Sequence, residues 1–204
     1  MAHMTEVTGM RPSPHQPLVD WCSLHQSEGA TTVSLLLTNL GSPTVVLLLG
    51  GLTAAGLFAF RRWRQAVFMI LSVLGVSVLN EGVKQVFHRP VPQVTAGLTP
   101  RTTVVRNPAL IVETPNLPRT VYSYPSGHAA GSLALLLAVG VLSWPTRWRG
   151  ATLAICTALA VLIGATRVYL WVHSLSDVLG GWSLAAAWIA LLYQTVLRPA
   201  RAGE

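Results

Sequence analysis

The chain has 204 residues, enough for one domain, with 51% hydrophobic and only 10% charged residues. Ordinary soluble domains carry about 25% charged residues. This composition, with a mean hydropathy of +0.52, therefore excludes a typical soluble domain and predicts an integral membrane protein. The net charge of +7 is attributed to membrane topology and an anion-binding site, and no nucleic-acid partner is expected.

Residues 1–30 form a polar tail rich in proline and histidine, without the apolar core of a cleavable signal peptide. Residues 31–204 are expected to form a single membrane-embedded domain, in which residues 31–40 are apolar but too short to cross a bilayer. We predict an all-α integral membrane bundle with five transmembrane helices. These helices are expected at about residues 43–60, 66–87, 126–144, 151–171 and 174–197.

A long connection, roughly residues 88–124, follows the second predicted helix. It holds six prolines and has no sustained helical period. Loops of this length without structure of their own are uncommon unless they are functional. Arg101, Arg106 and Arg119 within it are interpreted as solvated loop charges, with steering of anionic headgroups as the alternative.

The basic residues predict how the bundle is oriented. Five spans in alternation place the arginine-containing turns at residues 61–64 and 145–150 and the C-terminus on one side, which the positive-inside rule makes cytoplasmic. The long loop is then extracytoplasmic. The same side collects the polar residues at the other helix ends: Lys84, Arg89, His128, Arg167, His173 and Asp177. We therefore expect a functional site at that level.

The first polar cluster runs from Lys84 to Pro90, at the end of the second predicted helix. Two fixed cations at a helix end, Lys84 and Arg89, can clamp an anion. The alternative pairs Lys84 with Glu81, three residues away on one helix face, beside a juxtamembrane arginine. This cluster alone does not decide between the two interpretations.

The second cluster, Tyr124-Pro125-Ser126-Gly127-His128, stands at the start of the third predicted helix. Proline at a helix entrance, followed by serine and glycine, leaves free backbone N–H groups at the positive end of the helix dipole, which favours anion binding. Gly127 allows a phosphate to approach the backbone closely, and His128 is a candidate proton donor to a leaving group. The alternative is an ordinary Pro-Ser helix start.

The third cluster places Arg167, His173 and Asp177 inside otherwise apolar sequence, where charged groups are costly unless they have a task. On a helix, His173 and Asp177 would share one face, so that the carboxylate holds one ring nitrogen and frees the other as a nucleophile or base. The planar guanidinium of Arg167 can donate two parallel hydrogen bonds to a phosphate or a carboxylate. The alternative is a structural His–Asp pair with an arginine at a membrane interface.

Taken together, the three clusters supply the parts of phosphoryl transfer, in which positioning and charge neutralisation dominate. No metal or other cofactor is expected. Carboxylates are too few to hold a metal, since only Glu81 and Asp177 lie in or near the spans, with Glu113 in the long loop.

The clusters resemble, in order and spacing, the three signature motifs of the type 2 phosphatidic acid phosphatase family over roughly residues 42–190. The second motif matches as Pro125-Ser126-Gly127-His128, and the third matches Ser-Arg-x5-His-x3-Asp with Thr166 in place of serine. The first departs from the bacterial Lys-x4-Arg-Pro-Arg-Pro, because Val91 replaces the second arginine. Since that arginine is normally the family's phosphate ligand, either Arg89 takes its place or the site is weakened.

The resemblance implies roles for the site residues. His173 would attack phosphorus to form a phosphohistidine, Asp177 would hold His173, and His128 would protonate the leaving group before water hydrolyses the intermediate. The groups implied to hold the phosphoryl oxygens are Lys84, Arg89, Ser126, Gly127 and Arg167. Family membrane members commonly have six spans, against five expected here.

The implied function is metal-independent hydrolysis of a lipid phosphate or diphosphate, such as undecaprenyl diphosphate, phosphatidylglycerol phosphate or phosphatidic acid. It would take place at the extracytoplasmic face of the plasma (inner) membrane, with the substrate reached from the bilayer. The alternatives are a lipid phosphotransferase that uses the same site, and a catalytically weak anion-binding membrane protein. The sequence gives no oligomeric state.

Overall fold

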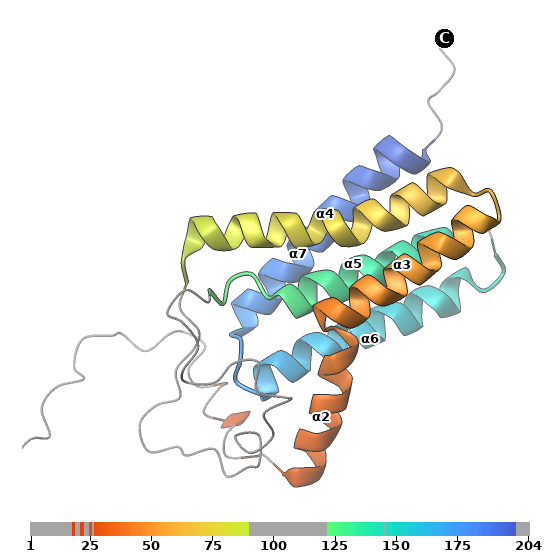
Figure 1. Ribbon diagram of the computed structural model, residues 1–204. Helices are drawn as coiled ribbons and strands as arrows, with labels where there is room; N and C mark the ends of the chain where they lie inside the picture. The colour runs from red at the N-terminus through yellow and green to blue at the C-terminus, as the bar shows by residue number, and fades with distance from the viewer. Residues whose placement is uncertain are drawn as a thin grey trace, which may run out of the picture.

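A computed structural model describes residues 18, 21–22, 25, 27–89, 122–144 and 146–198. Within these ranges the regular elements are helices (Figure 1). They are α2 (Glu28–Leu40), α3 (Pro43–Ala59), α4 (Trp63–Phe87), α5 (Gly127–Leu142), α6 (Arg149–Tyr169) and α7 (Leu175–Leu192), and α7 continues into a π-helical turn, η2 (Tyr193–Leu197).

The described helices account for three membrane spans by length and composition alone: α4, α6, and α7 together with η2. A fourth is reached if α2 and α3, which are bent by 45° at their junction, count as one span. Helix α5 is apolar but has 16 residues, about 24 Å of helix against the roughly 30 Å of a hydrocarbon core. The chain is thus a multi-pass helical membrane protein, while the number of five spans stays a prediction.

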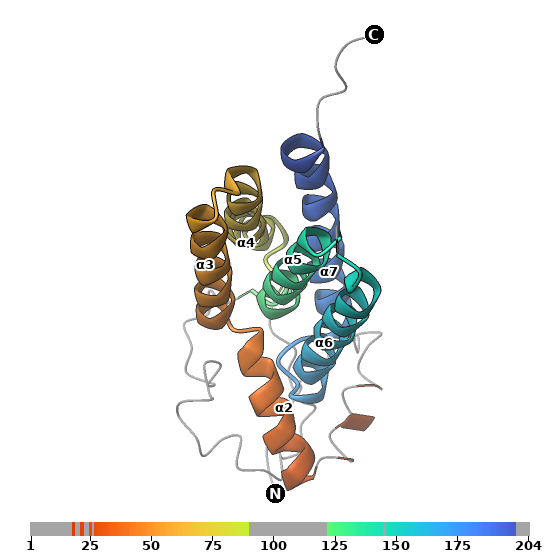
Figure 2. The ribbon, with the colours of Figure 1, turned by 90° about the vertical axis from the view of Figure 1, so that its right-hand side faces the viewer.

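Local sequence explains the bend between α2 and α3. Gly41 follows the last residue of α2, and Ser42 and Pro43 begin α3, with the Ser42 hydroxyl accepting the Val45 backbone N–H. Proline at the first helical position gives up an N–H that would be unpaired there anyway. Residues 31–40, expected to be too short to span, therefore form most of a separate helix set at an angle to α3 (Figure 2).

Helix α5 lies in the middle of the bundle, in contact with α3, α4, α6 and α7 (Figure 2). Its alanines and glycines let the neighbouring helices approach closely. The main buried core consists of Val46, Ala54, Phe68, Met69, Val73, Val76, Ala130, Ala134, Leu135, Ala138, Ala185, Ile189 and Leu192. Large apolar side chains also cover the outer faces of the bundle, as at Val78, which is 71% exposed. Lipid chains are the natural cover for such faces.

The two ends of the bundle differ in chemistry. The turn between α3 and α4 and the turn between α5 and α6 lie at one end (Figure 1), and both contain arginines. At the same end, Arg64 donates hydrogen bonds to the backbone oxygens of Val196, at 2.8 and 3.0 Å, and of Arg198, at 3.3 Å. The end of α4, the start of α5 and the α6–α7 turn lie at the opposite end.

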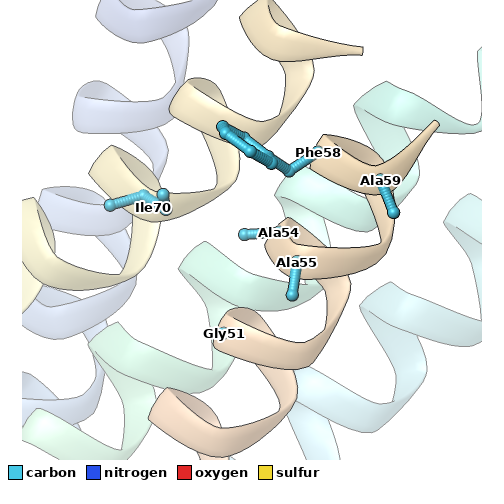
Figure 3. A pocket seen from close by; sticks show the side chains of 6 residues that line it. All are labelled: Gly51, Ala54, Ala55, Phe58, Ala59 and Ile70. Carbon is cyan, nitrogen blue, oxygen red and sulfur yellow. The ribbon is translucent and has the colours of Figure 1, made fainter. Parts of the chain in front are cut away.

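An apolar groove runs between α3 and α4 (Figure 3). Its lining residues are Gly51, Ala54, Ala55, Phe58, Ala59 and Ile70. None of these side chains is charged or forms hydrogen bonds, so the groove has no chemistry of its own and is not the candidate site.

Candidate active site

Asp177 lies at the centre of the polar end of the bundle, in the first turn of α7. The backbone N–H of Ser174 donates to Asp177 Oδ2 at 2.9 Å, and Ser174 Oγ accepts the Asp177 N–H at 3.3 Å, which makes a capping box. The Asp177 side chain is fully buried. A carboxylate is stabilised at a helix N-terminus, so the local sequence fixes both the start of α7 and the position of this acid.

Arg89, two residues beyond α4, is the charged partner of Asp177. Its Nη1 donates to Asp177 Oδ1 at 2.8 Å and to Ser176 Oγ at 2.6 Å. The pair joins positions 88 residues apart in the chain. Because a buried carboxylate needs compensation by charge and hydrogen bonds, this pairing explains why Asp177 is tolerated. Sequence reasoning placed Arg89 on the phosphate, and the structure places one of its nitrogens on the carboxylate.

His173 is buried, and its Nδ1 lies 3.8 Å from Asp177 Oδ2. The prediction that both residues share one helix face was wrong, because Ser174 caps α7 and leaves His173 in the preceding turn. That turn is shaped by Trp171, whose φ of 61° is left-handed, and by the Arg167 carbonyl, which accepts the N–H groups of Val172 and His173. A separation of 3.8 Å exceeds hydrogen-bond length, and catalytic contacts commonly shorten when substrate binds.

Arg167, in the last turn of α6, is buried and reaches across to α2. Its Nη1 donates to Thr38 Oγ1 at 3.1 Å, and Thr38 is itself buried. Sequence reasoning did not find Thr38. The two residues are 129 positions apart, and a threonine in an apolar stretch gives no signal of such a contact.

The second motif forms the start of α5. Ser126 is its N-cap, and the Ser126 backbone N–H donates to the Asp177 carbonyl at 2.9 Å. A Cβ on Gly181 would lie 2.6 Å from the Ser126 carbonyl oxygen, so only glycine lets α7 come this close to α5. Gly127 and His128 occupy the first turn of α5.

His128 lies at the same end of the bundle as the residues of the other two motifs. It lies in the first turn of α5, at the end of the bundle where the last turn of α4, with Lys84, and the α6–α7 turn, with His173, also lie. Glu81 accepts a hydrogen bond from Gln85 at 3.1 Å, and no ion pair between Glu81 and Lys84 exists in the described part of the chain. The alternative interpretation of the first cluster, a Glu81–Lys84 pair, is therefore not supported.

The two described ends of the long loop lie side by side. The Ser123 backbone N–H donates to the Arg89 carbonyl at 2.8 Å, and the Arg89 guanidinium lies 5.4 Å from the centre of the Tyr124 ring. The loop predictions for Val91, Arg101, Arg106 and Arg119 lie outside the described residues. Glu113 does as well.

The described residues contain no group of three or more His, Cys, Asp or Glu side chains placed to hold a metal. What they bring together at one end of the bundle are the members of all three motifs: Lys84, Arg89, Ser126, Gly127, His128, Arg167, His173 and Asp177. This arrangement combines three cations, two imidazoles and the N-terminus of α5. Chemically, it can neutralise an anion and offer a nucleophile and an acid beside it.

The fold and site define a class: multi-pass helical membrane proteins in which three polar motifs meet at one end of the bundle. The chain belongs to the PAP2 superfamily, whose family model matches residues 62–201. The fold is similar to that of a solved structure, the first transmembrane PAP2-type phosphatidylglycerolphosphate phosphatase from Bacillus subtilis. The structural match covers 94% of this chain and 88% of the Bacillus chain, with a TM-score of 0.74. That TM-score shows a shared fold, at a sequence identity of 23%.

Two curated relatives carry phosphatase names. The chain is 27% identical over 153 residues to phosphatidylglycerophosphatase B of Bacillus subtilis (strain 168), a match that covers 72% of this chain and 66% of the relative. It is 35% identical over 142 residues to an undecaprenyl-diphosphatase of Sulfolobus acidocaldarius, which covers 67% of this chain and 57% of the relative. The chain thus spans somewhat less than two thirds of the length of the curated relatives it matches.

Proposed function

We propose that this protein hydrolyses a lipid phosphate or diphosphate without a metal ion, through a phosphohistidine intermediate. The observation that carries the proposal is the meeting of His173, Asp177, His128 and three cations at one end of the bundle. Membership of the PAP2 superfamily and the phosphatase names of both relatives support it. Candidate substrates are phosphatidylglycerol phosphate, undecaprenyl diphosphate and phosphatidic acid.

In the proposed mechanism, His173 attacks phosphorus and Asp177 orients its ring. His128 gives a proton to the departing lipid alcohol or lipid phosphate, and then takes one from the water that hydrolyses the phosphohistidine. Lys84, Arg167, Ser126 and the Gly127 amide stabilise the phosphoryl oxygens. These groups neutralise the negative charge on the phosphoryl oxygens in the transition state.

Arg89 has a double task in this scheme. One nitrogen of its guanidinium holds Asp177, while its side chain remains 45% exposed. The guanidinium has five N–H donors, so donors beyond those on Asp177 and Ser176 can reach a phosphoryl oxygen. Arg89 would in this way supply part of the phosphate binding that the family's second arginine provides and that Val91 does not.

We further propose that α3 to α7 all cross the plasma (inner) membrane and that the site faces the extracytoplasmic side. The arginine-containing turns lie at the opposite end of the bundle from the site, which the positive-inside rule assigns to the cytoplasm. A site level with the lipid headgroups suits an amphiphilic substrate.

The test is phosphate release by the purified protein in detergent with EDTA. Phosphatidylglycerol phosphate, undecaprenyl diphosphate and phosphatidic acid are compared, with His173→Ala as the control variant. We expect release that survives EDTA and is lost in the variant. Transfer of the phosphoryl group to an added lipid or sugar acceptor, in place of release of inorganic phosphate, would favour a phosphotransferase. No release from any lipid by folded protein would favour the weak anion-binding alternative.

A further inference from the structure

Asn80 is a buried amide on α4, one helical turn before Lys84, and the proposed mechanism gives it no role. The residue is 6% exposed. Its Oδ1 is enclosed and has no hydrogen-bond partner among the residues that the structure describes. Burying an amide oxygen without a partner costs free energy, and each such group in a native structure needs an explanation.

The Asn80 side chain faces the start of α5. A Cβ on Gly127, the first residue of α5, would lie 3.4 Å from Asn80 Nδ2. The Oγ of Ser126 just before it is also buried and, within the described ranges, without a partner. Two enclosed polar side chains thus flank a helix N-terminus whose backbone N–H groups favour an anion.

The chemistry of an amide narrows the choice of ligand. Asn80 offers a donor at Nδ2 and an acceptor at Oδ1. A terminal phosphoryl group has a second pKa of about 6, so near neutral pH its oxygens accept hydrogen bonds and its monoprotonated fraction also donates one. Such a group can satisfy both ends of the amide. A phosphodiester, the headgroup linkage of bulk phospholipids, has no P–OH group to donate.

We propose that Asn80 selects terminal phosphoryl groups over phosphodiesters. Its Nδ2 donates to a phosphoryl oxygen, and its Oδ1 accepts from the phosphoryl hydroxyl. The proposal rests on the proposed function, because the group selected is the one that His173 attacks. A site at headgroup depth is surrounded by phosphodiester lipids, so it needs a means of rejecting them.

The experiment measures binding without turnover. Radiolabelled orthophosphate is dialysed to equilibrium against the full chain in detergent, for the wild type, Asn80→Leu and Gln85→Leu. Gln85 is the matched control, an exposed amide on the same helix. We expect Asn80→Leu to weaken orthophosphate binding by roughly 10- to 100-fold, Gln85→Leu to leave it unchanged, and dimethyl phosphate to displace the label poorly.

Thermal unfolding separates selection from a structural role. Asn80→Leu replaces an unpaired buried amide by an apolar group of similar size, so we expect its unfolding temperature to stay level or to rise. Wild-type orthophosphate affinity in folded Asn80→Leu would overturn the proposal. Equal displacement by dimethyl phosphate and orthophosphate would do the same.

The two proposals fail in different ways. If the wild type binds orthophosphate but hydrolyses no lipid phosphate, the proposed function is refuted and the selection by Asn80 stands as a property of a binding site. If the wild type hydrolyses lipid phosphate and Asn80→Leu binds and hydrolyses equally well, the role of Asn80 alone is refuted.

Discussion

The hydrogen bond between Thr38 and Arg167 predicts that α2, which lies outside the matched family region, contributes to activity. Thr38→Val keeps the shape of the side chain and removes the hydroxyl. Both residues are buried and the bond is 3.1 Å long, so water cannot replace it easily. A hydrogen bond to a charged group contributes about 1.5–3 kcal/mol. Because Arg167 has further interactions, we take the lower end, about 1.5 kcal/mol.

That free energy corresponds to roughly a tenfold change in rate or affinity. If Arg167 stabilises the transition state, the loss in Thr38→Val falls on kcat and on kcat/KM alike. The assay is steady-state phosphate release from a lipid phosphate in detergent, with kcat and KM determined separately. Thr38→Ser is the matched control, since it keeps the hydroxyl, and we expect it to retain most of the activity.

Two results would refute the reasoning. Full activity in Thr38→Val would show that Arg167 does not depend on α2. Equal losses in the valine and serine variants would show that packing at this position matters and the hydrogen bond does not. Thermal unfolding of both variants checks that the fold is intact.

The remaining predictions concern charge, packing and metal. Arg89→Met removes the charged partner of the buried Asp177 carboxylate; we expect unfolding free energy to fall by about 1.5–3 kcal/mol, and unchanged stability on denaturation in detergent would contradict the pairing. Gly181→Ala places a Cβ 2.6 Å from the Ser126 carbonyl oxygen and should cost about 1–3 kcal/mol. Gly82→Ala, with nothing within 4 Å, is its control, and equal thermal stability of the two would refute the close contact. Phosphate release should keep its rate in EDTA, and a loss restored by added magnesium would refute metal independence.

The helices could be predicted from sequence because apolar run length and helix-start residues act locally. Ser42 and Pro43 begin α3 as expected, and the apolar stretch ending at Phe87 is one helix. The angle between α2 and α3 could not be predicted, since it depends on what the two helices pack against. A Cβ on Gly41 would lie 2.6 Å from the Ile163 side chain, a contact that no local pattern reveals.

That the three motifs meet at one end of the bundle could be predicted from the sequence, whereas the contacts among their residues could not. Motif spacing named His128, His173 and Asp177, because the chemistry requires those residue types. The partner of Asp177 was missed, since nothing in the sequence shows that Arg89 approaches a carboxylate 88 residues away. The placement of His173 before α7 was missed because the four-residue spacing was taken as helical, whereas Ser174 caps the helix.

The most direct test of the account is to trap the covalent intermediate. The wild type and His173→Ala are mixed with a lipid phosphate carrying a radiolabelled terminal phosphate, quenched within milliseconds, and mapped for label. A phosphohistidine mechanism predicts a label that is stable in base and labile in acid, carried by His173 and absent from the variant. Rapid phosphate release with no label on any histidine would contradict this mechanism. Label on a residue other than His173 would show that His173, the partner of Asp177, is not the nucleophile.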